Sequence, residues 1–195
     1  MARYGKEHKE ETRRRIVEKA GRRLKANGID GSEVATLMAD AGLTNGAFYA
    51  HFASKEDLVA TAVADQLGVQ RERYSAAAPG LEGVRQMVRE YLSMTHRDSL
   101  QDGCPSAALL AEIGRCSQDT KRAYTEGVLA IVDEIAGRLT PDDPRAGRGK
   151  TLGLFAVLFG TMQLSRALSD QQLADEVLQE GIKNALALID TDARA

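Results

Sequence analysis

Residues 32–55 contain the pattern that most restricts what this chain can fold into, because two short helical segments flank a tight turn. The first predicted helix runs from about residue 33 to residue 40 and follows Ser32, a residue type that caps helix starts. Its apolar residues have the i, i+3, i+4 spacing of a buried face and are Val34, Leu37 and Met38. Gly42 supplies the backbone freedom for a turn at 41–43. The spacing therefore predicts a helix-turn-helix.

The second helix of this motif is expected to begin after Thr44, which can cap it. Its first turn, 45–47, carries side chains small enough to enter the major groove of DNA, and Phe48 and Phe52 follow at core spacing. An asparagine amide can hold adenine through two hydrogen bonds, and an alanine methyl can pack on a thymine methyl. We therefore expect Asn45 and Ala47 to read bases, with a second capping role for Asn45 as an open alternative.

Residues 12–59 resemble the DNA-binding domain of the tetracycline-repressor-like (TetR) family of bacterial transcription regulators. The ordered match comprises Thr12, Ile16, Ala20, Leu24, Asn27-Gly28, the stretch Val34 to Phe52, and Ser54 to Leu58. The resemblance implies an all-helical homodimer that binds a palindromic operator and releases it when a small molecule fills the C-terminal domain. Two positions that are commonly basic in the family are Asn45 and Thr36 here, so the operator sequence does not carry over.

By this resemblance, Thr44, Tyr49, His51 and Lys55 contact the DNA backbone. Tyr49 follows a phenylalanine that already faces the core, which frees its hydroxyl for phosphate, and Lys55 lies at a helix start, where the dipole also favours phosphate. The neighbouring helix can add contacts, and an N-terminal arm with Arg3 and Lys6 can either reach DNA or remain a solvated tail. The residues expected at DNA are Ser32, Thr36, Thr44, Asn45, Gly46, Ala47, Tyr49, His51 and Lys55.

Charge is distributed unevenly along the chain. Residues 1–55 contain 11 Lys/Arg and 7 Asp/Glu, whereas residues 56–195 contain 15 and 21. A basic first part suits phosphate, and an acidic remainder is repelled by DNA. The arginine clusters at 13–15 and 22–23 are either a solvated helix face or part of a DNA-binding surface, and the adjoining helix-turn-helix favours the second interpretation.

Several function classes lack any supporting pattern. No apolar run approaches the roughly 20 residues of a membrane span, and the charged start has no signal core, so we expect a cytoplasmic protein. Two cysteines and three scattered histidines form neither a disulfide framework nor a zinc pattern. No phosphate-binding loop, nucleophile elbow or triad spacing occurs, so we expect no catalytic residue, metal or cofactor. A helical enzyme or binding module that retains a helix-turn-helix is the remote alternative.

The remaining periodicity predicts an all-α fold, with a three-helix DNA-binding domain at 1–53 and a helical effector-binding and dimerisation domain at 54–195. The helices are expected at about 9–27, 54–74, 81–97, from 104 onward, 118–139, 148–168 and 169–189. The last two have more apolar surface than one buried stripe needs, which favours a four-helix bundle between two copies, although a monomer could bury the same residues. The residues expected to allow close approach there are Gly153, Gly160, Gly181 and Ala185.

A small, largely apolar effector is expected between the helices of the second domain. The side chains predicted to line its site are Met87, Tyr91, Cys104, Leu110, Tyr124, Ile131, Phe155 and Phe159. Cys104 precedes Pro105 and is therefore the predicted N-cap of a helix, a position that favours a thiolate, although Asp98 and Asp102 oppose it.

The segment from Gly103 to Cys116 also resembles an electrophile-responsive branch of the family, in which a cysteine near this point senses reactive compounds. Cys116, if it lies on the same helix, is roughly 18 Å from Cys104, too far for a disulfide. Cys104 is therefore either a sensor or a core packing residue.

Overall fold

The computed structural model describes residues 2–190, with side chains from residue 7 onward, and shows helices and no strand in that range. The all-α prediction is therefore confirmed. The predicted arm side chains Arg3 and Lys6, and the tail beyond residue 190, lie outside the described residues. The α-helices are α1 (Ala2–Asn27), α2 (Val34–Asp40), α3 (Lys55–Ala76), α4 (Gly80–Tyr91), α5 (Met94–Asp98), α6 (Pro105–Ile113), α7 (Gln118–Leu139), α8 (Pro144–Ala167) and α9 (Gln171–Asp190). Two 3₁₀ helices complete the set, η1 (Asn45–Ala50) and η2 (Leu100–Asp102).

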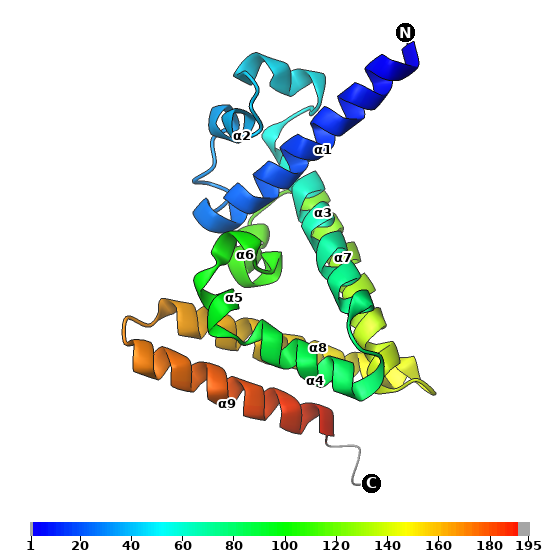
Figure 1. The fold of residues 1–195 in the computed structure, drawn as a ribbon, viewed down its shortest axis with the longest axis vertical. Coiled ribbons are helices and arrows are strands. Elements are labelled where there is room, and N and C mark those ends of the chain that lie inside the picture. Colours follow the sequence, from blue (N-terminus) through cyan, green and yellow to red (C-terminus); the bar gives the residue numbers. More distant parts are fainter. Residues whose placement is uncertain (1, 191–195) are drawn as a thin grey trace.

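The helices form a head and a body joined by α3 (Figure 1). The helices α1, α2 and η1 and the start of α3 make the head, while α3 continues into the body and packs along α7. The helices α8 and α9 pack together at the far end of the molecule from the head. No helix among residues 2–190 is long and apolar enough to cross a membrane.

The head is held by one apolar core. The faces of α1 and α2 supply Ile16, Ala20, Leu24, Leu37 and Met38, all fully buried. Phe48 and Phe52 close the core from η1 and the segment after it, with ring centroids 5.8 Å apart. Gly42 has a φ of 72°, and the amides of Gly42 and Leu43 donate to carbonyls of α2, which ends that helix. The predicted helix-turn-helix is confirmed.

The start of α1, the cap of α2 and the type of the second motif helix differ from the prediction. The helix α1 begins at Ala2 rather than near Lys9, and it continues through Gly5 in its N-terminal part. Ser32 is not the N-cap of α2: it is buried, its hydroxyl donates to the Gly28 carbonyl at 2.6 Å, and Glu33 takes the cap position. The second helix of the motif is a 3₁₀ helix, and Thr44 has the cap position without a side-chain cap bond.

In the body, the expected helix over 81–97 is wrong because the chain breaks into two helices. Leu92 leaves helical geometry at φ −90° and ψ 39°, and the Ser93 hydroxyl accepts the His96 amide at 3.2 Å to start α5. The helix α8 begins at Pro144 rather than Arg148, because Asp143 accepts the Ala146 amide at 3.2 Å. The bounds of α7 agree with the prediction.

Arg166 on α8 satisfies backbone carbonyls that the five-residue α5 leaves open. Its guanidinium donates to the carbonyls of His96 at 2.7 Å, Arg97 at 3.1 Å and Ala107 at 3.2 Å. A helix leaves its last four carbonyls without an intrahelical partner. Because α5 has only five residues, most of its carbonyls belong to this group. Arg166 thereby ties α5 and α6 to α8.

Three polar contacts join α1 and its following loop to the body. Lys25 is buried, and its ammonium donates to the carbonyl of Gly103 at 2.9 Å and to Gln66 Oε1 at 2.6 Å. Glu112 on α6 accepts the amides of Ile29 at 2.7 Å and Asp30 at 3.2 Å. The third contact is an ion pair of 3.0 Å between Arg22 and Asp102. Together these bonds join the end of α1 and the loop after it to α3, η2, the loop after η2, and α6.

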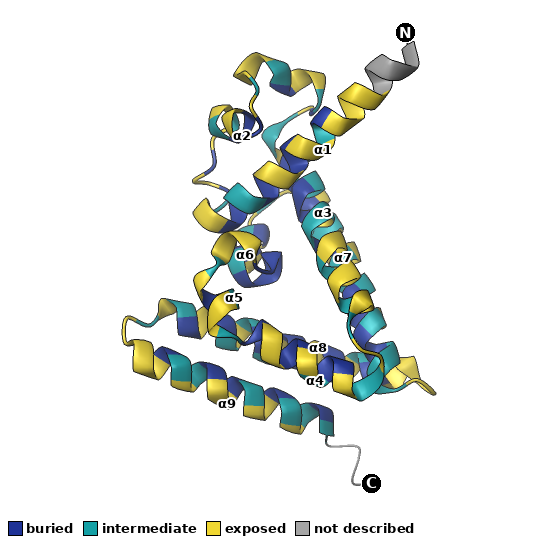
Figure 2. Ribbon diagram, in the orientation of Figure 1, coloured by how far each residue is buried: buried dark blue, intermediate teal, exposed yellow. Residues whose placement is uncertain are grey.

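Figure 2 shows exposed positions along α8 and α9. Among them are the large apolar residues Leu152, Leu164 and Leu173. Gly160 lies on this exposed surface, and a Cβ added to it would have no other atom within 4 Å. Gly181 differs, because it is buried against Thr161 of α8 within the same chain. Ala185 is also buried, and Gly153 approaches Leu188. The predicted role of Gly181 and Ala185 in contact between copies is therefore wrong, since α8 and α9 of one chain already use them.

Candidate DNA-binding surface and effector cavity

The first turn of η1 presents polar and small residues to solvent. Thr44, Asn45, Gly46 and Tyr49 are all exposed, and the side chain of Tyr49 is 79% exposed. Phe48 points into the core and meets the Tyr49 ring edge-on at 5.2 Å. This arrangement leaves the Tyr49 hydroxyl directed away from the core, at the protein surface.

The other residues predicted at DNA are less open. Thr36, Ala47, His51 and Lys55 are half-buried. Lys55 is the first residue of α3, whose N-cap Ser54 accepts the Asp57 amide at 3.2 Å. Burial, together with the nearby Lys9 and Arg13, lowers the pKa of His51, so this ring is neutral at pH 7 and brings no charge to a phosphate. Ser32 is buried and its hydroxyl already has a partner. Its predicted place on the DNA surface is therefore wrong.

Several arginines of α1 pair within the chain. Arg13 lies over the Phe52 ring, 4.7 Å from its centroid. Arg23 makes a forked contact with Asp40, and this hydrogen bonding lowers the pKa of the Asp40 carboxyl. Arg22 pairs with Asp102. The 22–23 cluster is thus partnered by head and body carboxylates, which differs from its predicted part in a DNA surface.

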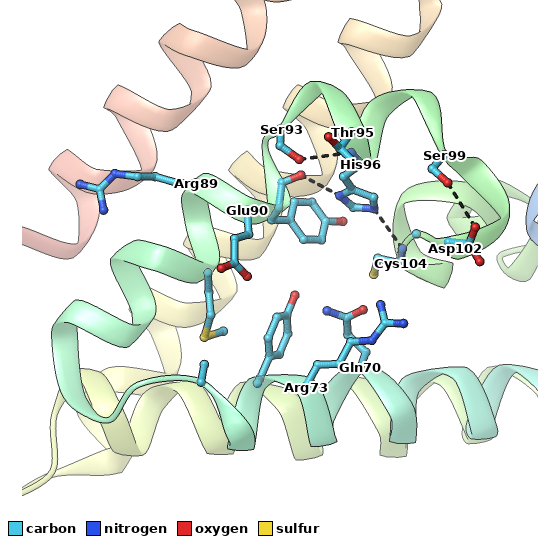
Figure 3. Close-up of a pocket in the computed structure, with 15 residues that line it drawn as sticks. Gln70, Arg73, Arg89, Glu90, Ser93, Thr95, His96, Ser99, Asp102 and Cys104 are labelled. Atoms are coloured by element: carbon cyan, nitrogen blue, oxygen red, sulfur yellow. Dashed lines mark hydrogen bonds between the residues drawn. The ribbon is translucent and has the colours of Figure 1, made fainter.

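The body contains a cavity of about 600 Å³ between α3, α4 and the segment from α5 to Cys104 (Figure 3). Its walls are formed by Gln70, Arg73, Tyr74, Ala77, Met87, Arg89, Glu90, Tyr91, Ser93, Thr95, His96, Ser99, Asp102, Gly103 and Cys104. Met87, Tyr91 and Cys104 belong to the predicted lining of the effector site. The polar residues from α3 and from 93–103 do not.

The other predicted lining residues lie elsewhere. Leu110 is 37% exposed on α6, and the Tyr124 hydroxyl donates to Ser106 Oγ at 3.0 Å. Ile131 and Phe155 are buried in the core, and Phe159 packs against it. None of these five residues lines the 600 Å³ cavity. Apart from the exposed Leu110, these side chains pack in the core between the helices that carry them.

His96 fixes the cavity wall at Cys104. Its Nε2 accepts the Cys104 amide at 3.1 Å, so the proton must be on Nδ1, which donates to the Tyr91 carbonyl at 2.7 Å. Burial, aided by Arg166, Lys25 and Arg73, lowers the pKa of His96 and keeps it neutral. Burial also lowers the pKa of Lys25, which holds the adjacent Gly103 carbonyl, to about 8. The loop from 102 to 104 is therefore held on one side by His96, which lines the cavity, and on the other side by Lys25 of α1.

The two cysteines are free and differ in their surroundings. Cys104 is the N-cap of α6, as predicted, with Pro105 as the first helical residue. Cys116 follows α6 rather than lying on it, and it lines a second cavity of about 240 Å³ between head and body. Burial, together with Asp30 and Glu112, raises the pKa of Cys116. Among the described residues, no group of three or more His, Cys, Asp or Glu side chains has the arrangement of a metal site.

Comparison with known proteins agrees with this geometry. Residues 16–62, which include the helix-turn-helix, match the family model of bacterial regulatory proteins of the tetR family. No curated protein sequence matches the chain. The fold resembles the reduced form of E. coli NemR, with a TM-score of 0.75, 16% identity, and 90% of this chain and 95% of that chain covered.

Two further solved structures share the fold. A TetR-family transcriptional regulator from Agrobacterium tumefaciens aligns with a TM-score of 0.73 and 17% identity, covering 90% of this chain and 98% of that one. FadR from Bacillus subtilis, in complex with stearoyl-CoA, aligns with a TM-score of 0.58 and 17% identity, covering 86% and 96%. Residues 16–62 thus carry the sequence of the tetR family of bacterial regulatory proteins, and most of the chain has the fold of these solved structures.

Proposed function

We propose that the chain is a repressor whose head (residues 1–53) binds a palindromic operator and whose body (residues 54–195) releases it when a small effector binds. The observation that carries this proposal is the bonding of one cavity wall to the head: Gly103 lines the cavity, and its carbonyl accepts from Lys25 of α1. A ligand that moves this wall also moves α1.

Release of DNA requires a difference in effector affinity between two conformations of the protein. An effector that favours a wall position incompatible with the DNA-bound head weakens operator binding, and the operator weakens effector binding by the same factor. Arg22 bonds the end of α1 to the body, and Glu112 bonds the loop that follows α1, so the head is expected to turn as a unit with these contacts. FadR, which shares this fold, holds stearoyl-CoA, and this supports a ligand-binding role for the body.

Replacing Lys55 or Tyr49 is expected to weaken binding to every DNA sequence by a similar factor, because both residues are assigned to phosphates. Lys55→Ala should lower the slope of log affinity against log salt by about 1. Asn45→Ala should instead change which bases are preferred. Operator fragments found by footprinting the DNA beside the gene, measured at several salt concentrations by gel shift, give the comparison.

Arg122→Gln is the matched control for that experiment, since it removes one charge from an exposed position on α7. It should leave both affinity and salt slope unchanged. Parental binding by Lys55→Ala, Tyr49→Phe and Asn45→Ala alike would disprove the assignment of the DNA surface.

A second candidate function, sensing of electrophiles or oxidants, is favoured by the position of Cys104 in the cavity wall, within the electrostatic reach of Lys25 and Arg166. The raised pKa of Cys116 makes it the slower cysteine. A group added to Cys104 would press on the loop that Lys25 holds.

Brief alkylation of the native protein is therefore expected to label Cys104 before Cys116, as read by mass spectrometry. The same treatment should dissociate the operator complex of the parent and of Cys116→Ser, but not that of Cys104→Ser. Equal labelling of the two cysteines would leave Cys104 as a packing residue.

A further inference from the structure

Tyr91 brings an unpaired buried hydroxyl to the 600 Å³ cavity. The residue is 5% exposed and lines the cavity, and no described residue forms a hydrogen bond with its hydroxyl. Its polar neighbour is the Cys104 thiol, a weak acceptor. Burial raises the pKa of Tyr91, so the group remains a protonated donor. An unsatisfied buried hydroxyl costs free energy unless another molecule supplies the acceptor.

Positive charge gathers around the same end of the cavity. Arg73 is an exposed residue of α3 that extends toward Cys104 (Figure 3), and its guanidinium has no ion-pair or hydrogen-bond partner among the described residues. Lys25 lies behind the Gly103 carbonyl, and Arg166 lies behind the carbonyl of His96. All three cations help burial to lower the pKa of His96, which lines the same cavity. The neutral ring adds no charge of its own.

The nearby carboxylates do not neutralise this end. Asp102 is engaged by Arg22 at 3.0 Å and by the Ser99 hydroxyl at 3.3 Å. Glu90 comes from α4, where Gln86 donates to it at 2.8 Å, and Figure 3 shows it on the other side of the cavity from Asp102. The cavity is therefore polarised, with cations and a free donor near Cys104 and a carboxylate on α4.

We propose that this cavity binds a small organic carboxylate, with its acid group accepting from the Tyr91 hydroxyl and the Arg73 guanidinium. The apolar part of the ligand lies on Tyr74 and Met87, which line the same cavity. A charge-assisted bond to arginine and a buried hydroxyl bond together distinguish an acid from its neutral analogue. This inference rests on the proposed function only in taking the cavity as the effector site, and it replaces the largely apolar effector expected from the sequence.

Titration calorimetry with matched acids and amides tests the proposal on the full-length protein. The probes are benzoate and benzamide, 4-phenylbutyrate and 4-phenylbutanamide, and octanoate and octanamide. At least one acid should bind tenfold or more tightly than its amide. Arg73→Gln and Tyr91→Phe should each weaken that acid by roughly tenfold to a hundredfold and leave the amide unchanged.

Arg89→Gln is the matched control, because Arg89 also borders the cavity but points away from it in Figure 3. It should bind the acid like the parent. Tyr91→Phe should melt at or above the parental temperature, since it removes an unpaired buried hydroxyl, so loss of acid binding would not reflect unfolding. Equal binding of acids and amides, parental acid binding by Arg73→Gln, or no binding of any acid at millimolar concentration would overturn the proposal.

Operator binding measured with the same probes separates this inference from the proposed function. If acids bind but leave the operator affinity unchanged, the anion site exists but has no role in releasing the operator. If neutral amides release the operator better than acids do, the chain is still an effector-released repressor, but the cavity has no carboxylate site.

Discussion

Gly160→Asp is expected to convert the protein to monomers that no longer hold a two-site operator. Gly160 lies on the exposed surface of α8 with open space around it, so an aspartate fits the single chain without strain. In the proposed four-helix interface it would bury two unpaired carboxylates close to the two-fold axis. The dimer should lose at least about 3 kcal/mol, more than a hundredfold in dissociation constant.

The effect on DNA follows from geometry. A two-fold dimer presents its reading helices about 34–36 Å apart, one turn of DNA, or a multiple of that spacing. A monomer binds only one half-site. It loses the gain in affinity that a dimer obtains by binding two half-sites at once, which is on the order of a hundredfold or more. Light scattering gives the mass of the protein, and gel shift with one or two half-sites gives the affinity.

Gly160→Ala is the control, because it adds a methyl group without charge and should remain a dimer. Gly181→Asp is unsuitable, since Gly181 is packed against Thr161 and the change would disturb the chain itself. A parent that is monomeric at micromolar concentration and binds the operator tightly, or a dimeric Gly160→Asp, would contradict this interface.

Arg166→Met is expected to lower the free energy of unfolding by about 2–4 kcal/mol. The methionine retains the apolar stem of the side chain but leaves the carbonyls of His96 and Arg97 without their donor. The half-buried guanidinium also costs desolvation, as its lowered pKa indicates, so the net loss is smaller than three separate hydrogen bonds would suggest. Urea denaturation followed by circular dichroism measures the change.

Arg122→Met provides the comparison for stability, because it makes the same substitution at an exposed site on α7. It should change the free energy of unfolding by no more than about 0.5 kcal/mol. Arg166→Lys should lie between the two, since one ammonium cannot reproduce the planar fork that reaches three carbonyls. Equal stability of the two methionine variants would mean that Arg166 does not anchor α5.

The helix-turn-helix was predictable because its determinants are local. Gly42 adopts the left-handed conformation that its turn needs, and the apolar spacing on either side follows directly from helix geometry. Ser32 was misassigned because its hydroxyl had a competing acceptor. Gly28 also takes a left-handed φ of 79°, and this turn brings its carbonyl to the Ser32 hydroxyl.

The cavity was largely missed because it depends on contacts between distant segments. Large apolar residues such as Phe155 and Ile131 have the character of pocket walls but form the core between helices. Arg73 and Gln70 resemble an ordinary solvated helix face until α4 and α5 are placed opposite them. Ser93 is a local signal for one wall of the cavity. It is a residue type that caps helix starts, so it predicts the break between α4 and α5.

The bonds that α1 makes to the body limit how this protein can be re-engineered. Grafting a head of different operator specificity would preserve α3. It would disturb the hydrogen bonds that the amides of Ile29 and Asp30, after α1, donate to Glu112. It would also leave the Gly103 carbonyl without the ammonium of Lys25 unless the donor head carried a lysine there. A chimera should therefore exchange only the exposed residues of η1, or transfer η2 and α6 along with the new head. In this regulator, the natural unit of exchange is larger than the DNA-binding domain.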